Sequence, residues 1–362
     1  MVQETNTYLQ VFLFNKNFKN QKMKKTTVFV LALLSVYSVC AKTTASSGYK
    51  IVNKISVEGD GKWDYLFSDD QANRLYVSHE NQVMVIDELT REVVGKITGL
   101  KGVHGIAIAP DLNKGFISNG KDSSVTIFDT HSFEVIKRVT VTGINPDAIL
   151  FDPFSQKVFV FNGHSNNATV IDAASNEIVA TIAFSGNPEF SQTDGKGKIY
   201  VNLESSSSIA VINATTYEVE NVWSVAPGTE PTGLAFDVDN QRLFSVCANK
   251  KMIVVDATSG KVLTELPIGL KPDGAGFDPS LNCAYSSNGD KTMTVVKEES
   301  DTKFRVSENV PTGQGARTIA VNKLTHHLYL PSARFEAAAA GQKPKMIPGK
   351  SFKKQWDEIT RE

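Results

Sequence analysis

Short apolar strands that end in an acidic or amide residue recur along most of the chain. The runs alternate Val, Ile, Phe or Met with smaller residues, and a polar turn and another strand-like segment follow each of them. They end at Asp87, Asp129, Asp172, Asn213 and Asp256, and a degraded sixth copy ends at Lys297. Successive ends are 42, 43, 41, 43 and 41 residues apart. The repeats are rich in Val, Ile, Thr, Phe and Tyr, and none of their twelve-residue windows has helical spacing. We therefore expect strands throughout.

Repeats of 40–45 residues made of short strands are typical of β-propeller blades, which bury their faces only against one another. Each repeat divides into four strands, a to d, and the acid at the end of strand c is expected to open a turn by accepting hydrogen bonds from the backbone two residues on. Residues 50–56 look like a strand d without its own a, b and c. We therefore predict an all-β, seven-bladed propeller of four-stranded antiparallel blades, closed by the N-terminal strand joining the last blade.

Two segments carry a family resemblance: LYVSHENQVMVID (residues 75–87) and VFVFNGHSNNATVID (residues 158–172). They resemble the YVTN β-propeller repeat, and the arrangement over residues 50–335 is similar to the YncE-like family. The resemblance implies the propeller fold and does not fix an activity, because one fold hosts many functions.

The first 41 residues have the parts of an export signal in order. Residues 1–22 have no motif and are interpreted as a mis-called start or a disordered extension, whereas residues 23–41 combine a basic start, an apolar run and a small-residue cleavage site after Ala41. Lipidation at Cys40 is a less favoured alternative. The apolar run is too short for a permanent membrane anchor. We expect a periplasmic or secreted protein with no transmembrane span, a propeller at residues 42–335 and a poorly patterned tail at residues 336–362.

The charge balance argues against nucleic acid as a partner. The chain has 38 basic and 39 acidic residues, and removal of residues 1–41 takes away five lysines and one glutamate, which leaves 33 against 38 and a net charge of −5. Nucleic-acid binding proteins usually carry a basic surface. We expect a monomer that binds an unidentified small molecule or an envelope protein.

One residue directly before each strand a is expected to lie at the mouth of the central channel. These ring residues are 40–44 residues apart and are mostly charged: Asp64, His104, Asp147, Glu189, Thr232, Asp273 and Arg317. Four acids that converge on one axis raise one another's pKa unless a cation relieves the repulsion. The alternative is structural, because a polar residue at this position can hold neighbouring blades together through their backbones.

The loops between strands b and c are expected on the same face and add further polar candidates. These are His79, Asn119, Asn162, His164, Glu204, Asn249 and Asn288. For the two histidines, an ordinary surface role is the competing interpretation. Cys247 and Cys283 are predicted to be two buried thiols, because their positions in adjacent blades are too far apart for a disulfide.

Three functions remain open at this point. The favoured one is a non-catalytic ligand-binding or scaffold protein that uses the acidic channel mouth, because no nucleophile elbow, phosphate loop, zinc helix or haem-attachment motif is present. The second is a hydrolase that resembles the propeller lactonases, with Ca²⁺ held by Asp147, Glu189 and Asp273 and with His104 as a candidate base. The third is a haem- or quinone-linked redox protein with His104 or His79 as axial ligand.

Overall fold

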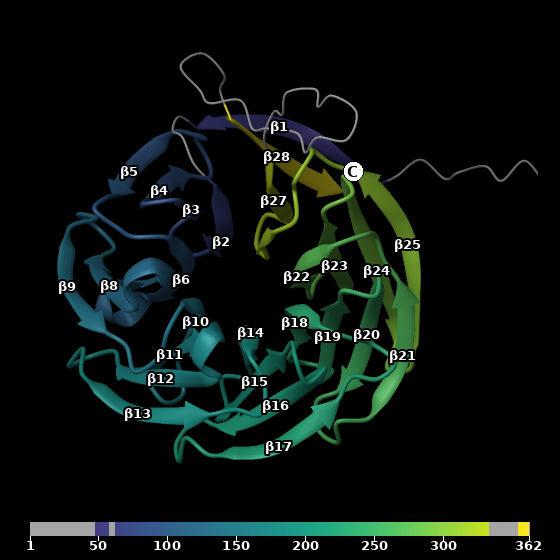
Figure 1. Ribbon diagram of the computed structural model, residues 1–362. Helices are drawn as coiled ribbons and strands as arrows, with labels where there is room; N and C mark the ends of the chain where they lie inside the picture. The colour runs from purple at the N-terminus through teal and green to yellow at the C-terminus, as the bar shows by residue number, and fades with distance from the viewer. Residues whose placement is uncertain (1–47, 58–61, 333–353, 362) are drawn as a thin grey trace, which may run out of the picture. The chain divides into compact units, whose positions relative to one another are not determined.

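The computed structural model describes residues 48–57, 62–332 and 354–361. The chain divides into residues 1–44 and 45–362, and every described residue belongs to the second unit. That unit is a ring of seven four-stranded antiparallel sheets, so the predicted seven-bladed β-propeller is confirmed (Figure 1). The predicted extension, export signal and Cys40 lie outside the described residues. Within the described part of the chain, no helix has the length and hydrophobicity to cross a membrane.

The strands form four concentric layers. The innermost strands are β2 (Trp63–Asp69), β6 (Val103–Ala109), β10 (Pro146–Asp152), β14 (Pro188–Thr193), β18 (Pro231–Asp237), β22 (Pro272–Asp278) and β26 (Ala320–Asn322). The second layer is β3 (Arg74–His79), β7 (Lys114–Asn119), β11 (Lys157–Asn162), β15 (Lys198–Leu203), β19 (Arg242–Cys247), β23 (Cys283–Asn288) and β27 (His327–Ser332).

The two outer layers complete each blade. The third layer is β4 (Gln82–Asp87), β8 (Ser124–Asp129), β12 (Asn167–Asp172), β16 (Ser208–Asn213), β20 (Lys251–Asp256), β24 (Thr292–Ser300) and β28 (Lys354–Arg361). The rim is β5 (Val93–Ile97), β9 (Val135–Thr140), β13 (Ile178–Ala183), β17 (Val219–Ser224), β21 (Val262–Pro267), β25 (Lys303–Pro311) and β1 (Tyr49–Val57). Three 3₁₀ turns lie between strands: η1 (Pro110–Leu112), η2 (Gly120–Asp122) and η3 (Gly163–Ser165).

Burial follows the layers. The second-layer strand β11 is buried at five of its six positions, whereas the rim strand β9 is exposed at five of its six positions. Both faces of an inner strand contact neighbouring blades, so apolar residues are favoured on both faces, and seven apolar clusters fill the spaces in the ring.

The last blade is closed by strands from both ends of the described chain. β28 lies between β27 and β1, and the sheet order is β1-β28-β27-β26. The N-terminal closing strand was predicted correctly. The segment described above as a poorly patterned tail contains the third strand of this blade, at residues 354–361.

A buried acid explains why β28 looks polar in the sequence. Glu358 is fully buried at a position that is apolar in most other third strands, and its carboxylate accepts hydrogen bonds from Arg91 Nε (2.8 Å) and Nη2 (3.3 Å). His327 Nδ1 is 3.1 Å from the same carboxylate. Arg91 follows β4, so this ion pair connects the last blade to the first. Arg91 is exposed and Glu358 is buried, so loss of Arg91 would leave a buried carboxylate without its guanidinium partner, which is unfavourable.

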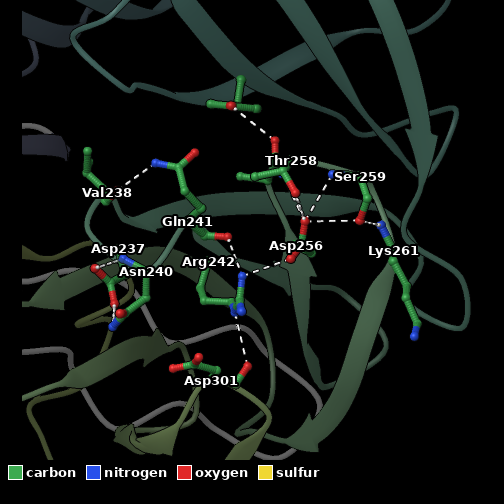
Figure 2. Close-up of polar contacts among 12 residues, drawn as sticks. Asp237, Val238, Asn240, Gln241, Arg242, Asp256, Thr258, Ser259, Lys261 and Asp301 are labelled. Carbon is green, nitrogen blue, oxygen red and sulfur yellow. Dashed lines mark hydrogen bonds and ion pairs between the residues drawn. The ribbon is translucent and has the colours of Figure 1, made fainter.

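The acids that end the third strands form the predicted turns. Asp172 Oδ1 accepts backbone hydrogen bonds from Ala174 (3.1 Å) and Ser175 (2.8 Å). Asp256 repeats this with Thr258 and Ser259, both at 3.0 Å, and its second oxygen accepts a bond from Arg242 (Figure 2). Asn213 makes the same turn in its blade, because an amide oxygen accepts the same bonds.

Candidate functional site

The seven ring residues meet in one pocket at one end of the central channel. Six of them are the second residues of inner strands, and in each of these blades the residue before pairs with the last residue of the second-layer strand. This equal register places the six at the same height, and Arg317, three residues before β26, lines the same pocket. They line a cavity of about 240 Å³, the channel-mouth pocket, whose ring residues are Asp64, His104, Asp147, Glu189, Thr232, Asp273 and Arg317.

The charged ring residues pair unevenly. His104 Nδ1 lies 2.6 Å from Asp64 Oδ2 and 3.6 Å from Asp147 Oδ1. Arg317 Nη1 lies 3.0 Å from Asp273 Oδ2, and its Nη2 lies 3.9 Å from Asp64 Oδ1. Glu189 forms no ion pair with any residue in the described ranges. The positive charges of the pocket therefore lie on the side away from Glu189.

Burial and mutual repulsion raise the pKa of three ring acids. Burial, with further charge from Asp147, raises the pKa of Glu189 to about 9. Burial raises the pKa of Asp273 to about 7 although Arg317 opposes the shift, and it raises the pKa of Asp147 to about 6 against the opposing charge of His104. These carboxylates are therefore costly to ionise together while the pocket contains no additional cation.

His104 is held by carboxylates. Burial alone would lower its pKa, but the hydrogen bond to Asp64 and the charge of Asp147 outweigh burial, and the pKa is raised. Asp147 Oδ1 is shielded from solvent and accepts no hydrogen bond from any described residue. It is the one ring carboxylate oxygen in that condition within the described part of the chain.

A possible metal-binding group differs from the predicted one. Ligand atoms of Asp64, His104 and Asp147 all lie within 4.8 Å of one another, whereas Glu189 and Asp273 do not belong to this group. One imidazole with two carboxylates suits Zn²⁺ or a similar ion better than Ca²⁺, which prefers six to eight oxygen ligands. The three side chains thus fit an ion such as Zn²⁺. Binding of that ion would replace the hydrogen bond between His104 and Asp64.

Two aromatic rings form the floor of the pocket. Tyr65 of β2 and Phe190 of β14 stack across the channel with their ring centroids 5.5 Å apart and their planes at 24°. The residue that follows the ring residue is small in the other five blades: Gly105, Ala148, Gly233, Gly274 and Thr318. Both rings also line a second cavity of about 310 Å³, the inner chamber, so the pair separates the channel-mouth pocket from it.

The structural role considered for the ring residues is carried mainly by other side chains. Ser118 Oγ, on β7, donates to the Asp147 carbonyl in the next blade, and Ser287 Oγ donates to the Arg317 carbonyl at 2.6 Å. Asn202 Nδ2 donates to the Thr232 and Gly233 carbonyls. Among the ring side chains, Thr232 alone makes such a bond, to the Pro272 carbonyl at 3.3 Å. Serine and asparagine of the second layer therefore join the blades, and the ring carboxylates are left to face the pocket.

Most of the predicted loop residues do not reach the pocket. His79, Asn119, Asn162 and Asn288 are at most 2% exposed and do not line it. The asparagines instead donate hydrogen bonds within their own blades, as Asn119 does to Thr126 Oγ1 and Asn162 to Thr169 Oγ1. The reason is that both faces of a second-layer strand are covered, so polar groups there must find partners inside the blade.

The remaining predicted loop residues lie outside the lining of the pocket. His164 is exposed in η3, and Asn249 is half-buried and donates to the Pro227 carbonyl at 2.8 Å. Glu204 accepts a hydrogen bond from Asn187, and its charge contributes to the raised pKa values of Glu189 and Asp273. Both described cysteines are buried free thiols, as predicted.

Sequence reasoning did not identify Tyr65 and Phe190. A signal was nevertheless present, because the position after the ring residue is Gly, Ala or Thr in five repeats and aromatic in only two. The two exceptions lie in the first and fourth blades, which face each other across a seven-membered ring.

Comparison with known proteins supports the fold alone. No family model and no curated protein sequence matches the chain. Among solved structures, Kuenenia stuttgartiensis hydrazine synthase is 18% identical with a TM-score of 0.65, covering 81% of this chain and 97% of that one. The structure titled U3-55K is 9% identical (TM-score 0.70, 85% and 98% covered), and the RRP9 WD40 repeats are 8% identical (TM-score 0.71, 86% and 98% covered). At these identities, the similarity is one of architecture.

Proposed function

We propose that this propeller is a binding protein whose channel-mouth pocket takes a cationic ligand. The observation that carries the proposal is the convergence of the ring residues on one cavity, with three acids whose pKa values are raised and one carboxylate oxygen without a hydrogen bond. A bound cation would offset the repulsion that raises these pKa values. The fold is consistent with a ligand-binding or scaffold role.

The test is a matched pair of triple variants. In the first, Asp147→Asn, Glu189→Gln and Asp273→Asn are combined in the pocket. In the second, Asp87→Asn, Asp129→Asn and Asp172→Asn replace the same number of carboxyl groups in the turns. Calorimetric titrations with Ca²⁺, Zn²⁺ and 2-phenylethylamine should show binding of at least one probe to the wild type and the turn variant, and none to the pocket variant. Equal binding to both variants, or no binding to any protein, would contradict the proposal.

A metal-dependent hydrolase is the second candidate, and one observation favours it. Asp64, His104 and Asp147 form a compact donor group. In a hydrolase, a metal at this group would supply a Lewis acid for an ester or lactone carbonyl. Asp64, His104 and Asp147 would hold it, and Arg317 would lie beside the site. Metal analysis of the purified protein, with a lactone panel run with and without chelator, distinguishes this candidate from simple binding.

Export to the periplasm or cell exterior and membership of the YncE-like family belong to the same proposal. They are supported by the order of charged, apolar and small residues before residue 42 and by the two YVTN-like segments. A binding protein in the cell envelope would meet its ligand outside the cytoplasm.

A further inference from the structure

The ion pairs in the channel-mouth pocket include Asp64 and Asp273 but leave out Glu189. Asp64 is paired with His104 and approached by Arg317, and Asp273 is paired with Arg317. Glu189 has no cationic partner among the described residues. Glu189 is therefore the ring carboxyl group that is left to pair with a positive group entering the pocket.

The surface beside Glu189 is aromatic. Phe190 follows Glu189 directly in β14, and its ring stacks on Tyr65 in the floor of the same cavity. A metal ion at Glu189 would gain little from this floor, because it needs several oxygen ligands to replace its water. A cation that carries carbon gains from both neighbours, through charge on one side and through apolar and cation–π contact on the other.

We propose that the ligand of the channel-mouth pocket is an organic ammonium ion, with Glu189 as its counter-ion and the Tyr65–Phe190 pair as its apolar support. This inference rests on the proposed function and narrows the ligand class. The cavity of about 240 Å³ accommodates a small amine or the end of a lysine side chain. Phe190 is then a specificity-determining residue, because it selects an organic cation over a metal ion.

Proton release should accompany binding. The charged and titratable groups around Glu189 are Asp64, Asp147, Glu204, Asp273, Tyr65, His104 and Arg317. With a pKa of about 9, Glu189 is protonated at pH 7 when the pocket is free, and an ammonium ion favours its ionised form. Binding at pH 7 should therefore release a proton to the buffer, and affinity should rise between pH 7 and pH 9 as long as the amine stays protonated.

The test is calorimetric titration of the full chain with tetramethylammonium, 2-phenylethylamine, N-acetyl-lysine methylamide and Ca²⁺, at pH 7 in buffers of different ionisation enthalpy. Phe190→Leu should weaken binding of the ammonium probes about tenfold, whereas the matched control Phe236→Leu, whose side chain lines only the inner chamber, should leave it unchanged. Glu189→Gln should remove the proton release. Comparing the free amine with the lysine derivative distinguishes a small-molecule ligand from a side chain of a partner protein.

The outcomes separate the two proposals. If Ca²⁺ binds in the pocket while the ammonium probes do not, or if Phe190→Leu leaves ammonium affinity unchanged, the organic-cation inference is overturned and the broader function stands. If none of the probes binds to the wild type, both are overturned. Tyr65→Phe, which keeps the ring, should retain affinity; a loss as large as that of Phe190→Leu would show that the stacked pair does not act as an apolar support.

Discussion

Two sets of acids recur in this chain with the same period of about 42 residues, and their surroundings are opposite. The turn acids at the ends of the third strands accept backbone hydrogen bonds, and these bonds lower the pKa of Asp87 and, with Lys157, bring the pKa of Asp172 to about 2. The ring acids lie half-buried in a shared pocket, where burial brings the pKa of Glu189 to about 9. The turn acids therefore stabilise the fold in the ionised state, whereas an ionised Glu189 opposes it.

The difference separates structure from function in a repeat protein. An acid repeated in every blade and satisfied by its own turn has a structural explanation. The ring residues vary between Asp, Glu, Thr, His and Arg from blade to blade and meet around one axis, so no single structural explanation covers them all. Serines and asparagines make most of the backbone bonds between blades, which leaves the ring carboxylates facing the pocket.

The largest expected effect is on Glu189. Its folded-state pKa of about 9 exceeds the ordinary value of 4.5, so the folded chain binds more protons than the unfolded chain, and stability falls as pH rises from about 4.5 to 9. Glu189→Gln removes that loss and should raise the free energy of unfolding by up to about 3 kcal/mol at pH 7, with no change at pH 4. Denaturant titrations at the two pH values measure this. A destabilised variant at pH 7 would mean that Glu189 has a structural role.

The next effect is on a turn acid and has the opposite sign. Asp172→Ala should lower the free energy of unfolding by about 1 kcal/mol at pH 7, because two backbone N–H groups lose their acceptor. Asp172→Asn is the matched control and should lose less, because an amide oxygen keeps the turn, as it does at Asn213, and only the ion pair with Lys157 is lost. The stability that depends on the Asp172 charge is present above pH 4 and is lost as pH falls toward 2. Unfolding curves at pH 3 and pH 7 test both statements, and equal losses for Ala and Asn would refute the turn explanation.

The last prediction concerns Asp273, which combines both situations. Its pKa is raised to about 7 although Arg317 lies 3.0 Å away, so burial outweighs the ion pair. Stability therefore falls as pH rises from about 3.8 to 7, and Asp273→Asn should raise the free energy of unfolding at pH 7 with little change at pH 4. The same denaturant titration applies. A lower free energy of unfolding at pH 7 would show that the ion pair with Arg317 outweighs burial.

The sequence was sufficient to predict the seven-bladed ring and the residues that meet at the mouth of its channel. A period of 42 residues fixes the blade, and residues at equal positions in the blades must lie at equal height around the axis, so the convergence of Asp64, His104 and Asp147 followed from counting. The candidate metal-binding group of Asp64, His104 and Asp147 could not be predicted from the sequence. The spacing gives the order of residues around the ring, but it does not show which side chains pair. His104 bonds to Asp64, and this pairing determines which acids approach one another.

Other features were hidden for specific physical reasons. Asn119 and Asn162 look like loop residues in the sequence, but the neighbouring blades cover both faces of their strands and turn their amides inward. Strand β28 was missed because Glu358 occupies an apolar position and is compensated by Arg91, which lies 267 residues away in the chain. Tyr65 and Phe190 meet across the channel, and their contact is visible in the sequence only when the same position is compared in all seven repeats.

The pairing of β1 with β28 also determines when the molecule can be finished during synthesis. Tyr49 pairs with Arg361, so the closing sheet lacks its middle strand until residues 354–361 have emerged from the ribosome. The first six blades are made of neighbouring segments and can fold as they appear, because local contacts form early. Until then the first six blades form an open arc, and the apolar residues of the first blade that pack against the last blade stay uncovered.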